Sequence, residues 1–184
     1  MNIKDKINED LSPTRNLTGL HLKIVAAIAI IWSLFQLWYA SPFPFMFDFG
    51  MFKGLPARAI HLGFALTLTF LIFPISKGKR ISIFDIFISF VGAFCCLYIY
   101  FFYDQLVDRG GVLLNIIIGE SFNLPVELII GSCGILILLE ATRRAIGLPL
   151  VIIATCFLLF SYFGRYAPEI ISHGGLSLLS LIHI

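Results

Sequence analysis

The sequence predicts an all-α membrane protein, a polytopic bundle of about five transmembrane helices with its N-terminus in the cytoplasm. Hydrophobic residues make up 59% of the 184 residues, and charged residues only 13%. Soluble domains usually contain about 45–50% apolar and about 25% charged residues. A water-soluble core cannot bury this much apolar surface, whereas a bilayer solvates it on every side. At this length we expect one bundle rather than two domains.

The apolar residues gather into five stretches that are nearly free of charge and are separated by short charged loops. A helix needs about 20 mostly apolar residues to cross the hydrocarbon core of a membrane. Four of the stretches approach that length without an internal Asp, Glu, Lys or Arg. In order along the chain, we expect membrane helices over Ile24–Ala40, Ala59–Ser76, Ile86–Tyr103, Leu124–Leu139 and Ile146–Gly164.

The first expected helix follows a basic N-terminal segment, an arrangement that cleaved signal peptides share. Here the segment covers residues 1–23, and Ile24–Ala40 is longer than the apolar region of a signal peptide. We therefore expect an uncleaved membrane helix. The Pro-rich stretch Ser41–Phe45 comes next, and it is apolar but poorly suited to a helix. It favours an interfacial loop on the outer side.

Capping signals support the next boundaries. Ser82 and Asp85 have the spacing of a capping box and open the third helix. The uncharged segment Gly110–Gly119 follows this helix and is too short to cross, so we expect it at the membrane surface. Pro125 and Glu127 suit the first turn of the fourth helix, because a missing N–H is harmless there and a carboxylate meets the positive end of the helix dipole.

The fourth helix has the shortest uncharged core, the 12 residues Leu128–Leu139. Glu127 and Glu140 flank this core and must lie near the two interfaces if the helix crosses. A re-entrant or buried helix is the alternative. Gly147 and Pro149 then break the chain before the fifth helix.

The Lys and Arg residues predict the orientation, because cytoplasmic loops carry an excess of them. Alternate loops divide the thirteen basic residues nine to four, with the N-terminal segment on the richer side. This puts the N-terminus in the cytoplasm and, after five crossings, the C-terminus outside. The expected organisation is a cytoplasmic segment over 1–23, the bundle over 24–164, and an interfacial tail or the start of a further unit over 165–184.

No residue pattern indicates catalysis or a metal. The four cysteines lie inside apolar stretches without CxxC spacing, and no two of the four histidines have the i, i+4 spacing of a helical zinc site. The chain has no nucleotide-binding loop, no GxSxG and no HExxH. We therefore expect no catalytic residue, no metal and no cofactor. The net charge of +2 is too small to suggest nucleic-acid binding.

The most distinctive polar cluster is Glu140 with Arg143 and Arg144, followed by Gly147. If the fourth helix continues through it, Glu140 faces the two arginines at i+3 and i+4, the spacing of intrahelical ion pairs. Such a group can be an interfacial salt bridge with topology-setting arginines. The alternative is a docking or gating contact with a partner, since partly desolvated Arg–carboxylate pairs are strong and directional.

Other polar and small residues indicate helix packing. Gln36 is the strongly polar residue within the first helix, where one interhelical hydrogen bond worth about 1 kcal/mol would satisfy it. Ala26, Ala29 and Ser33 share a face of the same helix and allow another helix to approach closely. Because no helix centre carries an Asp, Glu, Lys or Arg, the proton relays and ion-coordinating carboxylates typical of transport pathways are not expected here.

Three blocks of sequence together resemble one family. They are Tyr103-Asp104 with Arg109-Gly110, the block Leu-Leu-Glu-Ala-Thr-Arg-Arg-Ala-Ile-Gly at 138–147, and Phe163–Pro168 followed by His173–Gly175. Over residues 20–184 the chain resembles the N-terminal part of fused permease subunits of tripartite ATP-independent periplasmic (TRAP) transporters. The most specific block is the one that contains Glu140, Arg143, Arg144 and Gly147.

The resemblance implies secondary transport in a bacterial inner membrane. Members of the family are similar to sodium-driven importers of small organic acids, which receive their substrate from a periplasmic binding protein. A large transport unit holds the ion and substrate sites, and a small unit of the kind seen here braces it. The resemblance thus implies that this chain is a scaffold or docking part. Arg109 and the 138–147 block would then have a structural or docking role. The resemblance also implies that the chain is a truncated or separately encoded part of a fused permease. The alternative is a free-standing membrane anchor that moves no solute.

Overall fold

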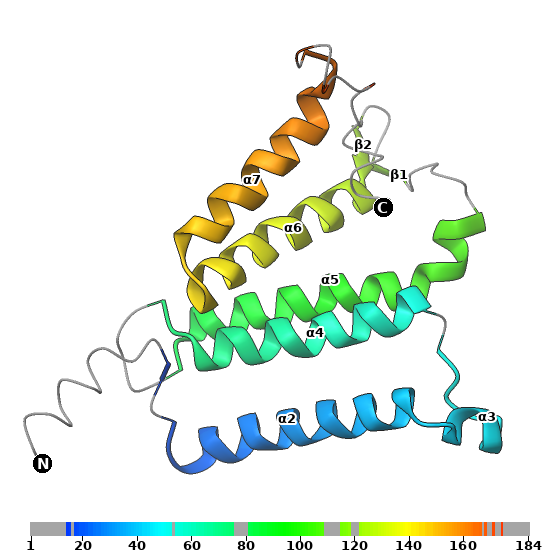
Figure 1. Ribbon diagram of the computed structural model, residues 1–184, viewed down its shortest axis with the longest axis vertical. Helices are drawn as coiled ribbons and strands as arrows, with labels where there is room; N and C mark the ends of the chain where they lie inside the picture. Colours follow the sequence, from blue (N-terminus) through cyan, green and yellow to red (C-terminus); the bar gives the residue numbers. More distant parts are fainter. Residues whose placement is uncertain are drawn as a thin grey trace, which may run out of the picture. The chain divides into compact units, whose positions relative to one another are not determined.

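The computed structural model describes residues 14–15, 17–52, 54–75, 81–108, 115–118 and 122–166, together with 168, 171 and 174. Helices make up most of this part of the chain, so the expected all-α class is confirmed. Figure 1 shows the elements in order: α2 (Gly19–Ala40), α3 (Phe43–Phe47), α4 (Gly54–Ile72), α5 (Ile83–Asp108), β1 (Asn115–Ile118), β2 (Phe122–Pro125), α6 (Val126–Ala145), α7 (Leu148–Phe163) and the 3₁₀ helix η1 (Gly164–Tyr166).

Within these ranges, four helical segments are long and apolar enough to cross a membrane: Gly19–Ala40, Gly54–Ile72, Ile83–Asp108 and Leu148–Tyr166. They correspond to the first, second, third and fifth expected spans. The protein is therefore a multi-pass helical membrane protein. The fourth expected span is also a helix, α6, with 20 residues. Only 12 uncharged residues lie between Glu127 and Glu140, fewer than in the other four helices, and its crossing of the bilayer stays a prediction.

The second span begins and ends about four residues earlier than the sequence predicts. We expected Ala59 as its first residue because Arg58 is charged, but α4 already begins at Gly54. Pro56 lies in the first turn, where its fixed φ suits a helix and its missing N–H is harmless. The helix ends at Ile72, two residues before Pro74, because a proline disfavours helical backbone at the residue before it.

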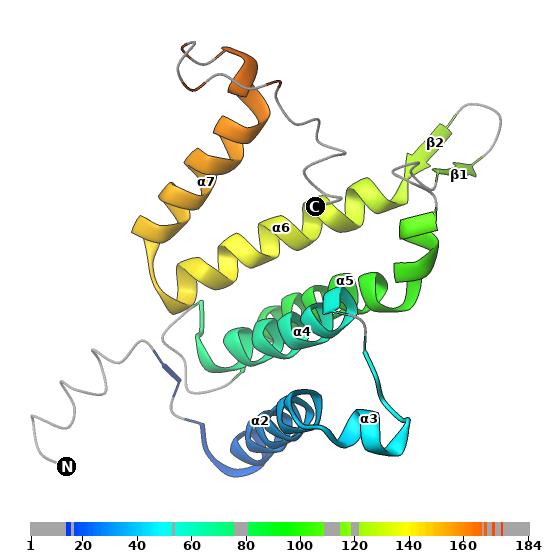
Figure 2. The same ribbon diagram turned by 45° about the vertical axis from the view of Figure 1, so that its right-hand side comes forward.

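The chain divides into two compact units, Met1–Leu97 and Tyr98–Ile184, and α5 runs from the first into the second. In the first unit α4 is the central helix, with 44% of its apolar window buried against 6% for α2. Val25 of α2 packs against Leu68 and Leu71 of α4 in a small core. On another face of α4, Gly63 lies so close to α5 that a Cβ there would be 3.4 Å from Cβ of Cys96. Both views show α4 and α5 side by side (Figures 1 and 2).

The Pro-rich loop after α2 is partly helical, although the sequence predicts a non-helical loop there. Pro42 is the N-cap of α3 and a second proline follows in the first turn, both positions that tolerate proline. The indole ring of Trp38 lies within 6.4 Å of three phenylalanine rings, those of Phe43, Phe47 and Phe49. Gly50 closes this cluster with φ 67°, and a Cβ at this position would be 2.9 Å from Nε1 of Trp38. Only glycine satisfies both constraints.

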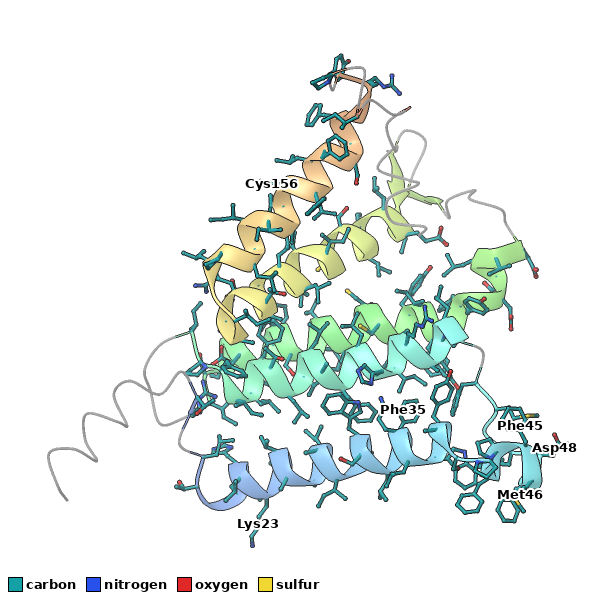
Figure 3. All side chains as sticks on the ribbon, in the orientation of Figure 1. Lys23, Phe35, Phe45, Met46, Asp48 and Cys156 are labelled. Atoms are coloured by element: carbon teal, nitrogen blue, oxygen red, sulfur yellow. The ribbon has the colours of Figure 1, made fainter. Side chains whose placement is uncertain are left out.

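The exposed side of this loop is strongly apolar. Phe45 is 78% exposed and Met46 70%, and both extend from α3 away from α2 (Figure 3). Asp48 ends α3 in the left-handed conformation, with φ 49°. An apolar loop of this kind, next to the end of a membrane helix, suits the bilayer interface, as the sequence predicts.

In the second unit a short β-hairpin precedes α6. The strands β1 and β2 pair antiparallel, with Ile118 opposite Phe122. The sequence analysis did not predict these strands. Part of the expected surface segment Gly110–Gly119 lies outside the described residues, and its described part forms β1. Leu124 and Pro125 belong to β2 rather than to the fourth helix, which begins at Val126.

The helices α6 and α7 form a helical hairpin, joined at the predicted break. The N–H groups of Ile146 and Gly147 both donate to the carbonyl oxygen of Thr142, at 2.9 and 3.2 Å, which closes the last turn of α6. Gly147 has φ 114°, a value that side chains with a Cβ rarely adopt. Pro149 follows in the first turn of α7. Gly147 and Pro149 therefore play the roles that the sequence predicts.

Candidate functional site: three polar groups on an apolar framework

A buried ion pair joins the N-terminal segment to two helices of the first unit. Nη2 of Arg15 donates to Oδ2 of Asp85 at 2.6 Å, and both side chains are only 1% exposed. Nη1 of Arg15 also donates to the carbonyl oxygen of Leu71 at 3.2 Å, and the backbone N–H of Arg15 to that of Ile72 at 2.8 Å. These carbonyls belong to the last two residues of α4, where no N–H within the helix remains to bond them.

The electrostatics of this group are favourable on three sides. The guanidinium of Arg15 lies at the negative end of the α4 dipole, and the carboxylate of Asp85 lies in the first turn of α5, at the positive end of that dipole. A buried charge is tolerated in a protein only when it is paired and hydrogen-bonded. The arrangement therefore fixes the chain at Arg15, the end of α4 and the start of α5 to one another.

The sequence predicts other roles for these two residues. Arg15 was one of several basic residues expected to set the topology, and Asp85 was expected in a capping box. Ser82 does act at this helix start, since the N–H of Phe84 donates to its Oγ at 3.3 Å. The ion pair joins positions 70 residues apart, and no local pattern indicates such a contact.

A second polar group lies between α2 and α4. Nε1 of Trp32 donates to Nδ1 of His61 at 3.2 Å, and the side-chain amide of Gln36 contacts the same nitrogen. The rings of Trp32 and His61 meet edge to face, with centroids 5.0 Å apart. Gln36 thus has the interhelical hydrogen bond that the sequence predicts. His61 lies seven residues inside α4, which begins at Gly54.

The third group is the predicted cluster in the second unit. Arg143 donates from Nε and Nη2 to the two carboxylate oxygens of Glu140, at 2.7 and 2.8 Å, and Nε of Arg144 donates to Oε1 at 2.7 Å. The helix does continue through these residues to Ala145. The i+3 and i+4 ion pairs are therefore both confirmed. Arg144 is 2% exposed whereas Arg143 is 42% exposed, so only one of the two arginines faces outward.

The two arginines change the acidity of Glu140, which lies beyond the uncharged core of α6. The hydrogen bond from Arg143 is the largest contribution to lowering its pKa from 4.5 to about 2. The same interaction raises the pKa of Arg143. Both shifts show that the charged forms of the pair are stabilised in the folded protein.

This shift predicts a pH dependence of stability. A carboxyl group whose pKa is lower in the folded protein stabilises the fold fully above its unfolded pKa, and the stabilisation is lost as the pH falls through the folded pKa. We expect the contribution of Glu140 to be complete above pH 4.5 and to decline from there toward pH 2. The measurement is the melting temperature in detergent across this range. The Glu140→Gln variant should lose this part of the pH dependence, and identical pH profiles of the two proteins would contradict the expectation.

The remaining sequence-predicted residues are placed as follows. Gly147 lies at the turn that follows the Glu140 cluster, and Arg109 lies outside the described residues. Cys95 and Cys96 are buried and Cys156 is exposed on α7 (Figure 3), all as free thiols. In the described part of the chain, no three His, Cys, Asp or Glu side chains gather closely enough to hold a metal ion.

Comparison of the chain with protein-family models, with curated proteins and with solved structures finds no match.

Proposed function

We propose that this protein is an integral membrane component of a TRAP-type secondary transporter for small organic acids, and that it acts as a scaffold or docking part in a bacterial inner membrane. It works with a large transport unit, which carries the coupling-ion and substrate sites, and with a periplasmic binding protein. The resemblance of the 138–147 block supports the family. The geometry supports the role within it.

The scaffold role is supported by the pairing of the buried charges, which hold helix ends together. Among the described residues of the first unit, Arg15 and Asp85 are the buried charged residues. They bond to each other, and Arg15 also bonds to the end of α4. They lie at helix ends, and the four candidate spans are unbroken helices, the last of which ends in the 3₁₀ helix η1. Secondary transporters usually build their ion and substrate sites from helices that are broken near the middle of the membrane. Unbroken helices with paired terminal charges are better suited to bracing than to transport.

The test is uptake by proteoliposomes under an inward sodium gradient. Vesicles with this chain alone should accumulate no labelled organic acid beyond the level of empty vesicles. Vesicles that also contain a large transport unit of the TRAP family, with the binding protein and substrate outside, should accumulate it. Replacing the sodium gradient by a potassium gradient is the matched control. Sodium-driven uptake by the chain alone would contradict the scaffold role.

A further inference from the structure

A small polar surface interrupts the apolar outside of α4. It consists of Arg58 and His61, which are both exposed and lie three residues apart, on one face of the helix. Ala65 continues the same face one turn further and is partly exposed. Arg58 has no ion pair or hydrogen bond with the described residues.

The hydrogen bonds of His61 determine which chemical groups can bind to this surface. The indole N–H of Trp32 can only donate, so Nδ1 of His61, to which it bonds, must be the acceptor. The ring then carries a hydrogen at Nε2, which donates outward. Within the described part of the chain this Nε2 has no hydrogen-bond partner, and the surface as a whole offers donors and a positive charge.

The position of His61 along α4 makes an N–H without an acceptor unfavourable in free energy. His61 is seven residues from the start of α4, which corresponds to about 10 Å along the helix axis. With the candidate span Gly54–Ile72 laid across a hydrocarbon core of about 30 Å, this position is inside the core, where no water satisfies an N–H and lipid chains offer no acceptor. Polar residues at such depth usually face another helix or a functional site.

We propose that the surface formed by Arg58, His61 and Ala65 is the docking site for a transmembrane helix of the large transport unit, which presents a carbonyl or carboxylate acceptor to Nε2 of His61. This inference rests on the proposed function and names the contact through which the scaffold would brace its partner. The small side chain of Ala65 lets the partner helix approach closely. An acidic group near the outer end of that helix complements Arg58.

A second copy of this chain does not fit the same surface. In a two-fold dimer within a membrane, the same residues of both copies face each other at the same depth. His61 would then place one N–H donor against another, and Arg58 would lie opposite a like charge. The chemistry requires acceptors, and these must come from a different surface.

The test uses the chain co-expressed with a large transport unit of the TRAP family, and two substitutions of His61. In His61→Asn the side-chain oxygen replaces Nδ1 as the acceptor for Trp32, but the outward N–H is lost. In His61→Gln the longer amide still reaches outward and can donate. We expect His61→Asn to weaken co-purification about 3- to 15-fold, as for the loss of one hydrogen bond between membrane helices. His61→Gln should retain most of the association.

Photo-crosslinking identifies the occupant directly. A photoreactive side chain at Ala65 should crosslink to the large unit. The same group at Ile30, which is 59% exposed on α2 and lies ten residues from the outer end of that helix, should crosslink to lipid and not to the large unit. Capture by Ala65 of lipid, of a second copy, or of α6 or α7 of its own chain would overturn the inference, as would unchanged association of His61→Asn.

Different results would contradict the proposed function and the docking site. If the unsubstituted chain does not associate with the large unit at all, the proposed function fails and the docking site fails with it. If the two associate and transport is normal, but neither Ala65 nor His61 takes part, only the docking site is wrong.

Discussion

Replacing Arg15 by Ala is expected to destabilise the protein by about 3–5 kcal/mol, the usual cost of removing one partner of a buried ion pair. The carboxylate of Asp85 would remain 1% exposed without its guanidinium. The carbonyl oxygen of Leu71 would also lose its donor. Asp85→Ala should cost a similar amount, because it leaves the buried guanidinium of Arg15 without a counter-charge.

Thermal or chemical unfolding in detergent micelles measures these changes. Lys23→Ala is the matched control, because Lys23 is a basic residue of the same unit that extends away from α2 (Figure 3) and is exposed. Its loss should change stability by about 0.5 kcal/mol at most. The double variant Arg15→Met with Asp85→Leu should cost less than either single Ala variant, because no unpaired charge remains. Equal effects of Arg15→Ala and Lys23→Ala would contradict the structural role of the ion pair.

Replacing both Arg143 and Arg144 by Glu is expected to disturb membrane insertion or assembly of the α6–α7 hairpin. Three carboxylates would then face one another within two turns of α6, and the one at position 144 would take a site that is 2% exposed. A buried charge without its partner costs about 3–5 kcal/mol. The richer side of the chain would also lose two of its nine basic residues, which weakens the signal for orientation.

A charge swap separates these two causes. Adding Glu140→Arg to the double variant restores opposite charges at i+3 and i+4. If the ion pairs matter most, the triple variant should recover folding, measured as yield of monodisperse protein in detergent and as labelling of the α6–α7 turn. Unchanged topology and complex formation in the double variant would reduce the two arginines to ordinary surface charges.

Helix identity could be predicted from the sequence because it depends on long runs of apolar residues, and the bilayer requires such runs to be helical. The boundaries of the second span were wrong, since the charge of Arg58 was used to place its start. Excluding Arg58 delayed the start of α4 to Ala59, although Pro56 marks a first turn nearer to Gly54. The α6–α7 turn was predicted well, because glycine with positive φ and proline in a first turn have local causes.

Of the polar groups, those within one helix could be predicted from the sequence, and those between distant segments could not. The ion pairs of Glu140 follow from spacing within one helix, and they were predicted. The contact between Arg15 and Asp85 depends on how three distant segments pack, and nothing in either residue's neighbours indicates it. The hydrogen bond between Trp32 and His61 joins two helices, and no spacing within either helix indicates it.

Accessibility mapping tests most directly whether these helices thread a bilayer. In a protein whose native cysteines have been replaced, single cysteines are introduced at Asp48, in the loop after α2, and at Ile146, between α6 and α7. They are then labelled by a reagent that does not cross the membrane. A cytoplasmic N-terminus with five crossings predicts that position 48 reacts from outside and position 146 only after the membrane is opened. Labelling of both positions from the same side, or recovery of a water-soluble monomer without detergent, would contradict it.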